Sequence, residues 1–321
     1  MSLPTFGFST TADEVATSLK DRITGKNVII TGTSINGLGF ETARVLAKYA
    51  NLVVITGYSP RGALQLSKDE IKTELPSANI RCLTLDLSSM AAIRTAAQEV
   101  NDHPEPIHVL LINNAAAAIG PFKLTADKLE SQIGVNHVGH FLFTKLIAHK
   151  LLATHKDGYT PRVVFLSSGA RLRQGVDLAA FEHPTAETYD SGNGYYQSKS
   201  ANILTAIELS KQSKGAIKAT AIYTNITLRE ESREYMQSMG LVDADGNSTG
   251  DESWAVKTIA QGVATTVVAA FDPSLEDKPG SYLADCAEDN GAIAPHTSDP
   301  VMAAKLWTVT EKIIGERFTF Q

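Results

Sequence analysis

Short apolar segments alternate with longer amphipathic ones along most of this chain, and this alternation restricts the possible folds more than any other feature. The apolar segments are rich in Val, Ile and Leu and predict buried strands at residues 27–31, 52–55, 80–85, 109–112 and 162–166. The segments between them repeat apolar residues every three or four positions, which predicts helices at residues 40–49, 63–75, 90–100 and 125–152. Repeated strand–helix–strand units predict an α/β fold, a single doubly wound parallel sheet with helices on both faces.

The rest of the chain extends this sheet, and we expect one domain over residues 1–321. Further strands are predicted at 217–223 and 281–283, and further helices at 196–213, 252–270 and 300–315. Thr11 and Glu14 have the spacing of a capping box, which predicts a short helix in an N-terminal extension at residues 1–25. The insertion at residues 227–251 is a candidate lid over the carboxyl ends of the strands, with an ordinary surface loop as the alternative.

Composition disfavours several classes of protein. Hydrophobic residues make up 43% and charged residues 20% of the 321 residues, which is typical of a compact globular chain. The formal net charge of −6, without a basic cluster, disfavours nucleic acid as a partner. The sequence has no run of 18 apolar residues and no secretory signal pattern. We therefore expect a cytoplasmic protein without a membrane partner, in which Cys82 and Cys286 are reduced.

A glycine-rich segment, residues 31–39, follows the first predicted strand and leads into the first predicted helix. Glycine at such a turn lets the backbone approach a pyrophosphate, whose negative charge is favoured at a helix N-terminus. The segment therefore predicts a dinucleotide site, although glycine-rich turns also occur for packing alone. The residues expected to contact the dinucleotide are Gly32, Ser34, Asn36, Gly37, Leu38 and Gly39.

The end of the second predicted strand bears on the choice between NAD and NADP. It has no carboxylate for the two free hydroxyls of the adenine-side ribose, which disfavours NAD. Tyr58, Ser59 and Arg61 stand there instead, and Ser59 and Arg61 are suited to a 2′-phosphate. A solvated surface arginine is an equally weighted alternative. After the third predicted strand, Asp86 and Leu87 are expected beside the adenine, and Asp86 is also a candidate helix N-cap.

Tyr195 and Lys199 are four residues apart in a predicted helix, so their side chains share one face. Lowering the pKa of a tyrosine from about 10 to about 7 requires roughly 4 kcal/mol of preferential stabilisation of the phenolate. A cation about 4 Å away supplies energy of this order at an effective dielectric constant of about 20. Tyr195 would then serve as a general acid or base. Pairs with this spacing are common by chance, and an ordinary surface helix is the alternative.

Other polar residues are expected at the same edge of the sheet. Ser168 follows the fifth predicted strand, where its hydroxyl would donate to a substrate oxygen, and Asn114 and Ala115 follow the fourth. Asn136 lies within a predicted helix. A buried amide there must be hydrogen-bonded, which fits a role in holding a water molecule between Lys199 and solvent.

These motifs together resemble the short-chain dehydrogenase/reductase family over residues 26–282, and residues 135–144 and 195–204 are most similar to its retinol-dehydrogenase-like branch, including fungal members. The resemblance implies a Rossmann fold and a nicotinamide dinucleotide as cofactor. It implies that Ser168 polarises the substrate oxygen, that Tyr195 exchanges its proton, and that Lys199 binds the nicotinamide ribose and lowers the pKa of Tyr195. It also implies that Asn136 completes a proton relay, that Thr224 binds the nicotinamide carboxamide, and that Asn114 and Ala115 contact the cofactor.

The sequence departs from the family pattern at several positions. The glycine-rich segment is one residue longer, with Asn36 in the extra position, and Ala116 stands where the family has glycine. Ala219 and Thr220 replace the Pro-Gly that precedes the nicotinamide-binding threonine, and Tyr58 stands where NADP-using relatives often have arginine. These departures bear on how the loop meets the phosphates and on which cofactor is used.

The sequence therefore predicts an oxidoreductase that uses NADP(H), with NAD as the alternative, and moves a hydride between the nicotinamide and an alcohol or carbonyl substrate. Met236, Met239 and Leu241 in the candidate lid favour a bulky apolar substrate, with internal packing as the alternative. His137 and His140 have no third ligand at a plausible spacing, so no metal is expected. A homo-oligomer is possible. The rival functions are a dinucleotide-binding sensor or scaffold without turnover, and a nucleotide-sugar epimerase or dehydratase.

Overall fold

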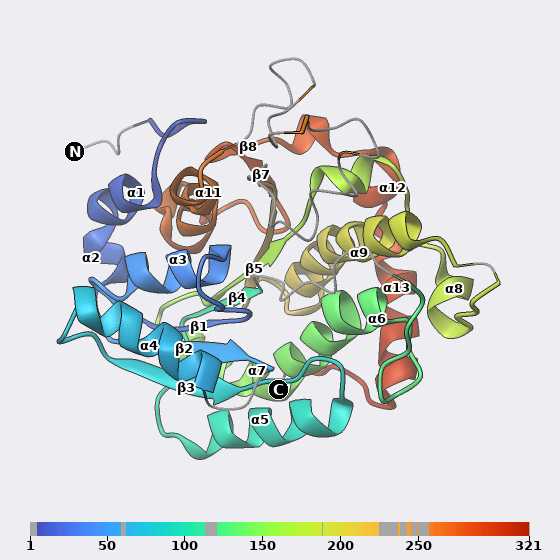
Figure 1. Ribbon diagram of the computed structural model, residues 1–321, viewed down its shortest axis with the longest axis horizontal. Helices are drawn as coiled ribbons and strands as arrows, with labels where there is room; N and C mark the ends of the chain where they lie inside the picture. Colours follow the sequence, from blue (N-terminus) through green and yellow to red (C-terminus); the bar gives the residue numbers. More distant parts are fainter. Residues whose placement is uncertain are drawn as a thin grey trace.

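The structure is a computed structural model that describes residues 5–58, 62–112, 121–187, 189–224, 237, 243–244, 249 and 257–320. These residues form an eight-stranded sheet with the order β3-β2-β1-β4-β5-β6-β7-β8 (Figure 1). The strands are β1 (Asn27–Ile30), β2 (Leu52–Gly57), β3 (Ile80–Thr84), β4 (Val109–Ile112), β5 (Arg162–Leu166), β6 (Lys218–Ile222), β7 (Tyr282–Ala284) and β8 (Ala287–Glu288). Strands β1 to β7 pair in parallel, which confirms the predicted doubly wound sheet.

The eighth strand was absent from the sequence prediction. It pairs antiparallel with β7 through a tight turn, in which Asp285 and Cys286 have φ angles of 49° and 66°. A strand of two residues is too short to show a periodic pattern, and neither turn residue is a glycine, so the sequence carries no strong hairpin signal here.

Alternate residues of each strand face two different layers of helices. In β1, Val28 and Ile30 pack with α3 (Leu38–Leu46), α4 (Gly62–Glu74) and α11 (Ile259–Phe271), whereas Ile29 packs with α5 (Met90–Asp102), α7 (Gly139–Lys156) and α9 (Ser191–Gln212). Because both faces are covered, the strands consist of uninterrupted apolar residues. The layers are visible in Figure 1 as helices above and below the sheet.

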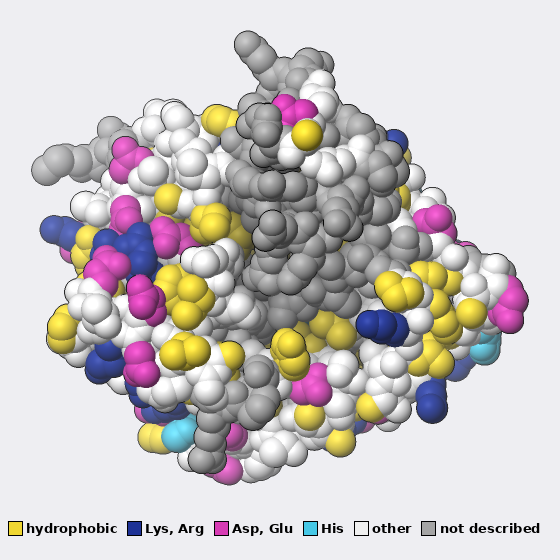
Figure 2. All heavy atoms as spheres, viewed as in Figure 1, with side chains coloured by type: hydrophobic (Ala, Val, Ile, Leu, Met, Phe, Trp, Pro, Cys, Tyr) yellow, Lys and Arg dark blue, Asp and Glu magenta, His cyan; other side chains and the backbone are white. Residues whose placement is uncertain are grey.

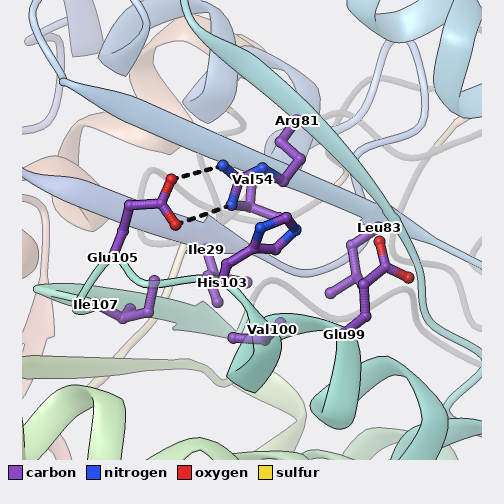
Figure 3. A pocket seen from close by; sticks show the side chains of 9 residues that line it. All are labelled: Ile29, Val54, Arg81, Leu83, Glu99, Val100, His103, Glu105 and Ile107. Atoms are coloured by element: carbon purple, nitrogen blue, oxygen red, sulfur yellow. Dashed lines mark hydrogen bonds and ion pairs between the residues drawn. The ribbon is translucent and has the colours of Figure 1, made fainter.

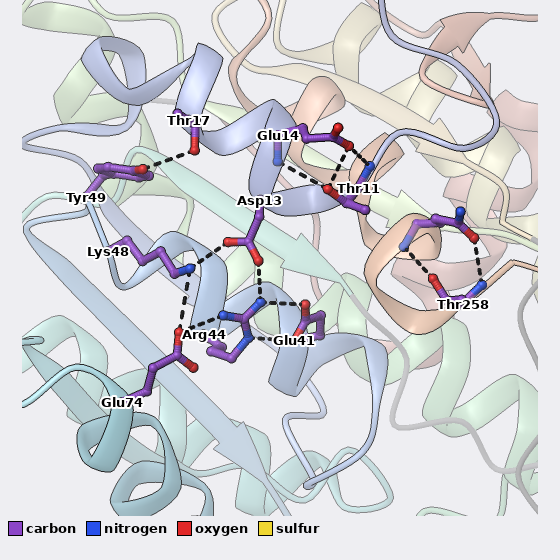
Figure 4. Close-up of polar contacts among 11 residues, drawn as sticks. Thr11, Asp13, Glu14, Thr17, Glu41, Arg44, Lys48, Tyr49, Glu74 and Thr258 are labelled. Atoms are coloured by element: carbon purple, nitrogen blue, oxygen red, sulfur yellow. Dashed lines mark hydrogen bonds and ion pairs between the residues drawn. The ribbon is translucent and has the colours of Figure 1, made fainter.

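The N-terminal segment is fastened to one of these layers. Helices α1 (Ala12–Ser18) and α2 (Lys20–Ile23) precede β1, and the predicted capping box is confirmed, because Thr11 and Glu14 bond to each other's backbone N–H groups. Arg44 of α3 forms ion pairs with Asp13 at 2.7 Å and with Glu74 at 2.9 Å (Figure 4). Charges of both signs lie side by side over these elements in Figure 2, at the left of the view.

Two predicted helices begin later than expected. The helix predicted at 125–152 starts with α6 (Ser131–Ile133), continues through a π-helical turn (Gly134–Val138) and then becomes α7. Glu130 caps it, because its carboxylate accepts from the N–H groups of Gln132 and Ile133. The helix predicted at 252–270 begins at Ile259, where Thr258 and Gln261 form a capping box. Apolar periodicity continued past both caps, so it placed the starts too early.

The remaining helices come after β5 in the chain. They are α8 (Leu178–Glu182), α12 (Pro295–Ser298) and α13 (Pro300–Ile314), with 3₁₀ turns at Gly169–Leu172, Pro273–Leu275 and Asn290–Ala292. Helices α12 and α13 pack against α9. Among the helices of the described ranges, none combines the length and the apolar character needed to cross a bilayer.

A small cavity lies between the sheet and the C-terminal end of α5, beside the ion pair of Arg81 and Glu105 (Figure 3). Its volume of about 10 Å³ has room for about one water molecule. Glu105 and Ile107 precede β4, so this part of the lining lies at the amino end of that strand. Open parallel sheets bind ligands at the carboxyl ends of their strands, and this cavity is therefore not the functional site.

Aromatic rings hold the C-terminal segment against α7. The ring of Phe318 stacks on Trp307 of α13 with centroids 5.1 Å apart and meets the edge of Phe141 of α7 at 5.5 Å. The ring of Phe320 stacks on that of Phe318, with the two centroids 4.6 Å apart. Phe318 is 6% exposed, so its burial joins α13 to the helix that carries the π-helical turn.

We expect Phe318→Ala to lower the free energy of unfolding by about 3 kcal/mol, because it removes a buried ring from three aromatic contacts. Urea unfolding followed by circular dichroism measures the loss. Phe320→Ala is the matched control, since Phe320 is only half-buried and should cost clearly less. Equal costs for the two variants would show that Phe318 does not anchor the segment.

Candidate functional site

The glycine-rich segment forms the turn between β1 and α3. Gly32 has a φ of +71°, and Asn36, the extra residue, has a φ of 62°. The left-handed region is costly for most residues but is tolerated by asparagine, which explains how the longer segment is accommodated. An added Cβ at Gly39 would lie 2.2 Å from the carbonyl oxygen of Gly32, so only glycine fits where the helix meets the loop.

The same turn is fixed to the neighbouring strand and leads into the start of α3. Thr33 donates from its N–H to the carbonyl of Thr56 at 3.0 Å, and its own carbonyl accepts from the Ser67 hydroxyl at 2.9 Å. The N-cap of α3 is Gly37, which has no side chain to bond the helix N–H groups. A helix start of this kind favours an anion. The predicted residues Gly32, Ser34, Asn36 and Gly37 lie in this turn, and Leu38 and Gly39 are the first two residues of α3.

Only some of the predicted adenine-side residues lie in the described ranges. Tyr58 is 73% exposed beyond the end of β2, whereas Ser59, Arg61, Asn114 and Ala115 lie outside the described residues, as do Ala116 and most of the candidate lid. These predictions therefore remain untested.

The N-cap prediction for Asp86 is wrong. The cap of α5 is Ser89, whose hydroxyl accepts from the N–H of Ala92. The Asp86 carboxylate instead accepts from the N–H and the hydroxyl of Ser88, at 2.9 and 2.6 Å. This local turn places the cap three residues later than the sequence suggested. Asp86 and Leu87 still follow β3, at the carboxyl edge where a ligand of the sheet would bind.

Ser168 and Tyr195 meet at the carboxyl end of β5. Their side chains are hydrogen-bonded to each other. Ser168 follows β5 by two residues, and Tyr195 lies in the second turn of α9, a helix that begins at the Asp190 cap. The two elements are joined by polar contacts, because Asn202 of α9 donates to the Leu166 carbonyl at 3.0 Å and the Ser167 hydroxyl donates to the Lys199 carbonyl at 2.9 Å.

Lys199 lies beside this pair, and its side chain is almost completely shielded from water. It is 1% exposed, and its Nζ lies 5.3 Å from the centroid of the Tyr195 ring. Burial lowers the pKa of Lys199 to about 7 and raises the pKa of Tyr195, while the hydrogen bond with Ser168 lowers the Tyr195 pKa. The prediction that Lys199 lowers the Tyr195 pKa is therefore not met in this structure. Desolvation of the phenolate is the largest cause of the raised pKa of Tyr195, and it outweighs the hydrogen bond with Ser168.

Asn136 lies in the π-helical turn and faces α9. Its Nδ2 donates to the Ser198 hydroxyl at 3.1 Å, and that hydroxyl donates to the Tyr195 carbonyl at 2.8 Å. The Oδ1 of Asn136 is buried and, among the described residues, has no hydrogen-bond partner. The predicted amide thus lies beside α9, with its Oδ1 left to accept from another group. π-helical turns are rare and occur often at functional sites.

Sequence reasoning missed Arg171, which holds the segment after Ser168 in place. Its guanidinium donates to the Ser168 carbonyl at 3.1 Å and lies over the rings of Tyr282 at 4.4 Å and Tyr223 at 5.3 Å. Arg171 is 3% exposed. An arginine in a polar loop usually indicates a surface position, so the sequence offers no signal for this buried one.

His137 and His140 are bonded to hydroxyls from different parts of the fold. His137 Nε2 lies 2.9 Å from Thr310 Oγ1 of α13, and His140 Nε2 lies 2.9 Å from Thr31 Oγ1, just before the glycine-rich turn. Burial lowers the pKa of both imidazoles to about 3. Sequence reasoning weighed these two residues only as metal ligands and found no signal for their separate contacts.

These residues fit a bound dinucleotide on three observations. The Gly32–Gly39 contact brings a bare backbone to the start of α3. Thr224 Oγ1, just beyond β6, is buried and lacks a hydrogen-bond partner in the part of the chain that the structure describes. The Lys199 ammonium has donors to spare, because its bond within the described residues goes to the Leu166 carbonyl at 3.4 Å. Each group offers a contact that a phosphate, an amide or a ribose hydroxyl would complete.

Comparison with known proteins agrees with this geometry. Residues 26–181 match the short chain dehydrogenase family. The chain is 33% identical over 317 residues to the chloroplastic short-chain dehydrogenase TIC 32 A of Brassica napus, with 96% of this chain and 94% of the relative covered. It is 31% identical to human retinol dehydrogenase 14, with 91% and 87% covered.

A solved structure shares the fold. A crystal structure of a protein from Mycobacterium paratuberculosis superposes with a TM-score of 0.69 at 24% identity, covering 92% of this chain and 96% of that one. The relatives and the matched residues together show that the chain belongs to the short-chain dehydrogenase/reductase family of NAD(P)-dependent oxidoreductases, in its retinol-dehydrogenase-like branch.

Proposed function

We propose that this protein is an NADP(H)-dependent oxidoreductase that transfers a hydride between the nicotinamide and an alcohol or carbonyl substrate, with a bulky apolar molecule as the favoured substrate. The observation that carries the proposal is the hydrogen bond between Ser168 and Tyr195, with Lys199 on the same face of α9. This group lies at the carboxyl edge of the sheet, where open α/β folds bind ligands.

In the proposed reaction the bound cofactor supplies or accepts the hydride, and the protein supplies the proton. Tyr195 donates a proton to the carbonyl oxygen in reduction and removes it from the hydroxyl in oxidation. Ser168 donates a hydrogen bond to the same oxygen, which favours the negative charge that develops there. The Oδ1 or the backbone carbonyl of Asn136 would accept a hydrogen bond from a water molecule. This water would link Lys199 to solvent.

Lys199 would switch the acidity of Tyr195 when the cofactor binds. Its pKa of about 7 reflects burial, which disfavours the ammonium. Ribose hydroxyls within reach of Nζ would accept hydrogen bonds from the ammonium and favour the charged form. A fully charged Lys199 then stabilises the Tyr195 phenolate, so we assign the low tyrosine pKa to the loaded enzyme.

The remaining cofactor contacts are proposed from the sequence and the fold together. The turn from Gly32 to Gly39 would hold the pyrophosphate, and Thr224 the nicotinamide carboxamide. Asp86, Leu87, Asn114 and Ala115 would line the adenine side and the central region. Tyr58, Ser59 and Arg61 would receive the 2′-phosphate, and the absence of a carboxylate at this position supports NADP over NAD.

The site does not depend on where in the cell the protein acts or on how many copies assemble. A cytoplasmic location and a homo-oligomer remain predictions from the sequence, and the TIC 32 A relative is described as chloroplastic. The lid at residues 227–251, with Met236 and Met239, likewise remains a prediction, and it is the part of the proposal on which the apolar substrate depends.

Tyr195→Phe should abolish turnover while leaving NADPH affinity within about threefold of wild type, because only the proton donor is lost. Absorbance at the nicotinamide band, with a panel of apolar alcohols and ketones, measures turnover, and quenching of protein fluorescence measures affinity. Tyr196→Phe is the matched control on the same helix and should remain active. A wild type that binds NADPH but converts no member of the panel would favour a sensor, and an active Tyr195→Phe enzyme would refute the assigned role.

Lys199→Met should remove a pH dependence of stability. The unfolded chain keeps this lysine protonated up to about pH 10.4, whereas the folded chain releases the proton at about pH 7. Between these values the unfolded state binds more protons, so wild-type stability gains up to about 1.4 kcal/mol per pH unit as the pH rises. Denaturant unfolding from pH 7 to 10 should show this gain in wild type and in Lys211→Met, whose lysine is exposed on the same helix, but not in Lys199→Met. A parallel rise in Lys199→Met would contradict a neutral buried lysine.

Arg61→Ala should raise the KM for NADPH roughly tenfold or more while leaving the KM for NADH within about twofold, because only NADPH carries the 2′-phosphate that the guanidinium would bind. Initial rates with both cofactors measure the selectivity, and NADH serves as the internal control in the same variant. An unchanged ratio of the two KM values would contradict a contact between Arg61 and the 2′-phosphate. It would also favour NAD as the cofactor.

A further inference from the structure

His140 contacts both the glycine-rich turn and the π-helical turn, and it has no part in the mechanism described above. It is 1% exposed and lies in the first turn of α7, directly after the π-helical turn. One ring nitrogen, Nε2, lies 2.9 Å from Thr31 Oγ1, the residue before Gly32. The other, Nδ1, lies 3.3 Å from the carbonyl oxygen of Asn136. One side chain thus contacts the proposed cofactor turn and the proposed relay residue.

The contacts determine which nitrogen carries the proton. A carbonyl oxygen can only accept, so Nδ1 must be the protonated nitrogen that donates to Asn136. The Val135 carbonyl also faces the ring, which adds to this preference. Nε2 is then an acceptor, and the Thr31 hydroxyl donates to it. Burial holds the imidazole neutral, because its pKa is lowered to about 3.

The position of the Asn136 carbonyl depends on this bond. In the π-helical turn, the N–H of Gly139 bonds to the Gly134 carbonyl, five residues back. This opens the regular ladder of the helix around Asn136, and the His140 imidazole supplies a donor to its carbonyl. The bond fixes the orientation of the Asn136 peptide, and the buried Oδ1 of the same residue, which has no hydrogen-bond partner among the described residues, is available to a water molecule.

We propose that His140 is a positioning residue that fixes the proton relay at Asn136 and the cofactor turn at Thr31 in one geometry. The proposal rests on the proposed function, because it assigns a purpose to contacts between two parts of that site. Through Nδ1 the imidazole sets the efficiency of proton transfer, and through Nε2 it sets how well the cofactor turn is held. Each nitrogen therefore affects a different kinetic constant.

His137 is a buried histidine without this role and serves as a comparison for His140. It lies three residues earlier, is 2% exposed and also has a pKa lowered to about 3. Its partners are Thr310 of α13 and Thr205 of α9, at 2.9 and 3.4 Å, on the C-terminal side of the fold. The two residues are matched in burial and charge, and they differ in what they contact.

The experiment separates the two nitrogens. His140→Asn keeps an amide donor near the position of Nδ1 and loses the contact with Thr31, so we expect the KM for NADPH to rise about tenfold with kcat within about threefold of wild type. His140→Gln keeps a partner for Thr31 and loses the donor to Asn136, so we expect kcat to fall about tenfold, with a larger solvent deuterium isotope effect and an unchanged KM. His140→Leu should show both changes. Thermal unfolding is recorded for every variant.

His137→Leu is the control for loss of a buried histidine. It should lose stability comparably to His140→Leu but keep the wild-type kcat, KM and isotope effect. If His140→Leu matches His137→Leu in all three constants, or if the Asn and Gln variants change the same constant, the positioning role is wrong and His140 serves packing alone.

A measurement without turnover keeps this test apart from that of the proposed function. Long-range proton–nitrogen correlation spectra of the cofactor-free protein should show His140 protonated at Nδ1 and bare at Nε2 from pH 5 to 8. Adding NADPH should shift the His140 nitrogens more than those of His137. The opposite tautomer would overturn the inference even in an active enzyme. Failure of NADPH to bind would instead overturn the proposed function and leave the tautomer result standing.

Discussion

The buried ammonium of Lys199 is the constraint on which the rest of the site depends. Within the described residues it has the Leu166 carbonyl at 3.4 Å and no carboxylate at ion-pair distance. An ammonium placed this way costs free energy of folding, which it reduces by giving up its proton near pH 7. An apolar residue at this position would avoid the cost and give a more stable fold. A ligand that brought acceptors to Nζ would offset this cost, which agrees with the proposed contact between Lys199 and the cofactor ribose.

The support around Ser168 follows the same logic. The carbonyls at the end of β5 and just beyond it accept hydrogen bonds from side chains of other elements. Asn202 of α9 bonds Leu166, and Arg171 bonds the Ser168 carbonyl. Because these donors come from two further elements and Arg171 is held by aromatic rings, the segment has little freedom to move. The Ser168 hydroxyl is thereby held against Tyr195 before any substrate arrives, which is the form of preorganisation that lowers a reaction barrier.

Much of the sheet could be predicted because its signals are local and periodic, and the pairing of Tyr195 with Lys199 followed from the pitch of one helix. The contributions that sequence reasoning missed depend on burial. Arg171 and His140 belong to residue types that are usually exposed or ambiguous, and only the fold shows that both are enclosed. Desolvation also raises the pKa of Tyr195 and lowers that of Lys199, and Coulomb's law for a charged lysine does not anticipate either effect. For Asn36 the sequence shows the insertion but not the left-handed conformation of its backbone.

The π-helical turn owes its place to two glycines, Gly134 at its start and Gly139 directly after it. A Cβ at Gly139 would lie 2.6 Å from the Leu87 carbonyl, and one at Gly134 would lie 2.6 Å from the Thr125 methyl group. The helix is therefore pressed against the loop after β3, on the side proposed for the adenine. Asn136 lies between these two close contacts, one with the backbone of Leu87 and one with the side chain of Thr125. The proposed relay residue and the proposed adenine side are thus linked through the contact between Gly139 and Leu87, and a larger residue at position 139 would disturb both.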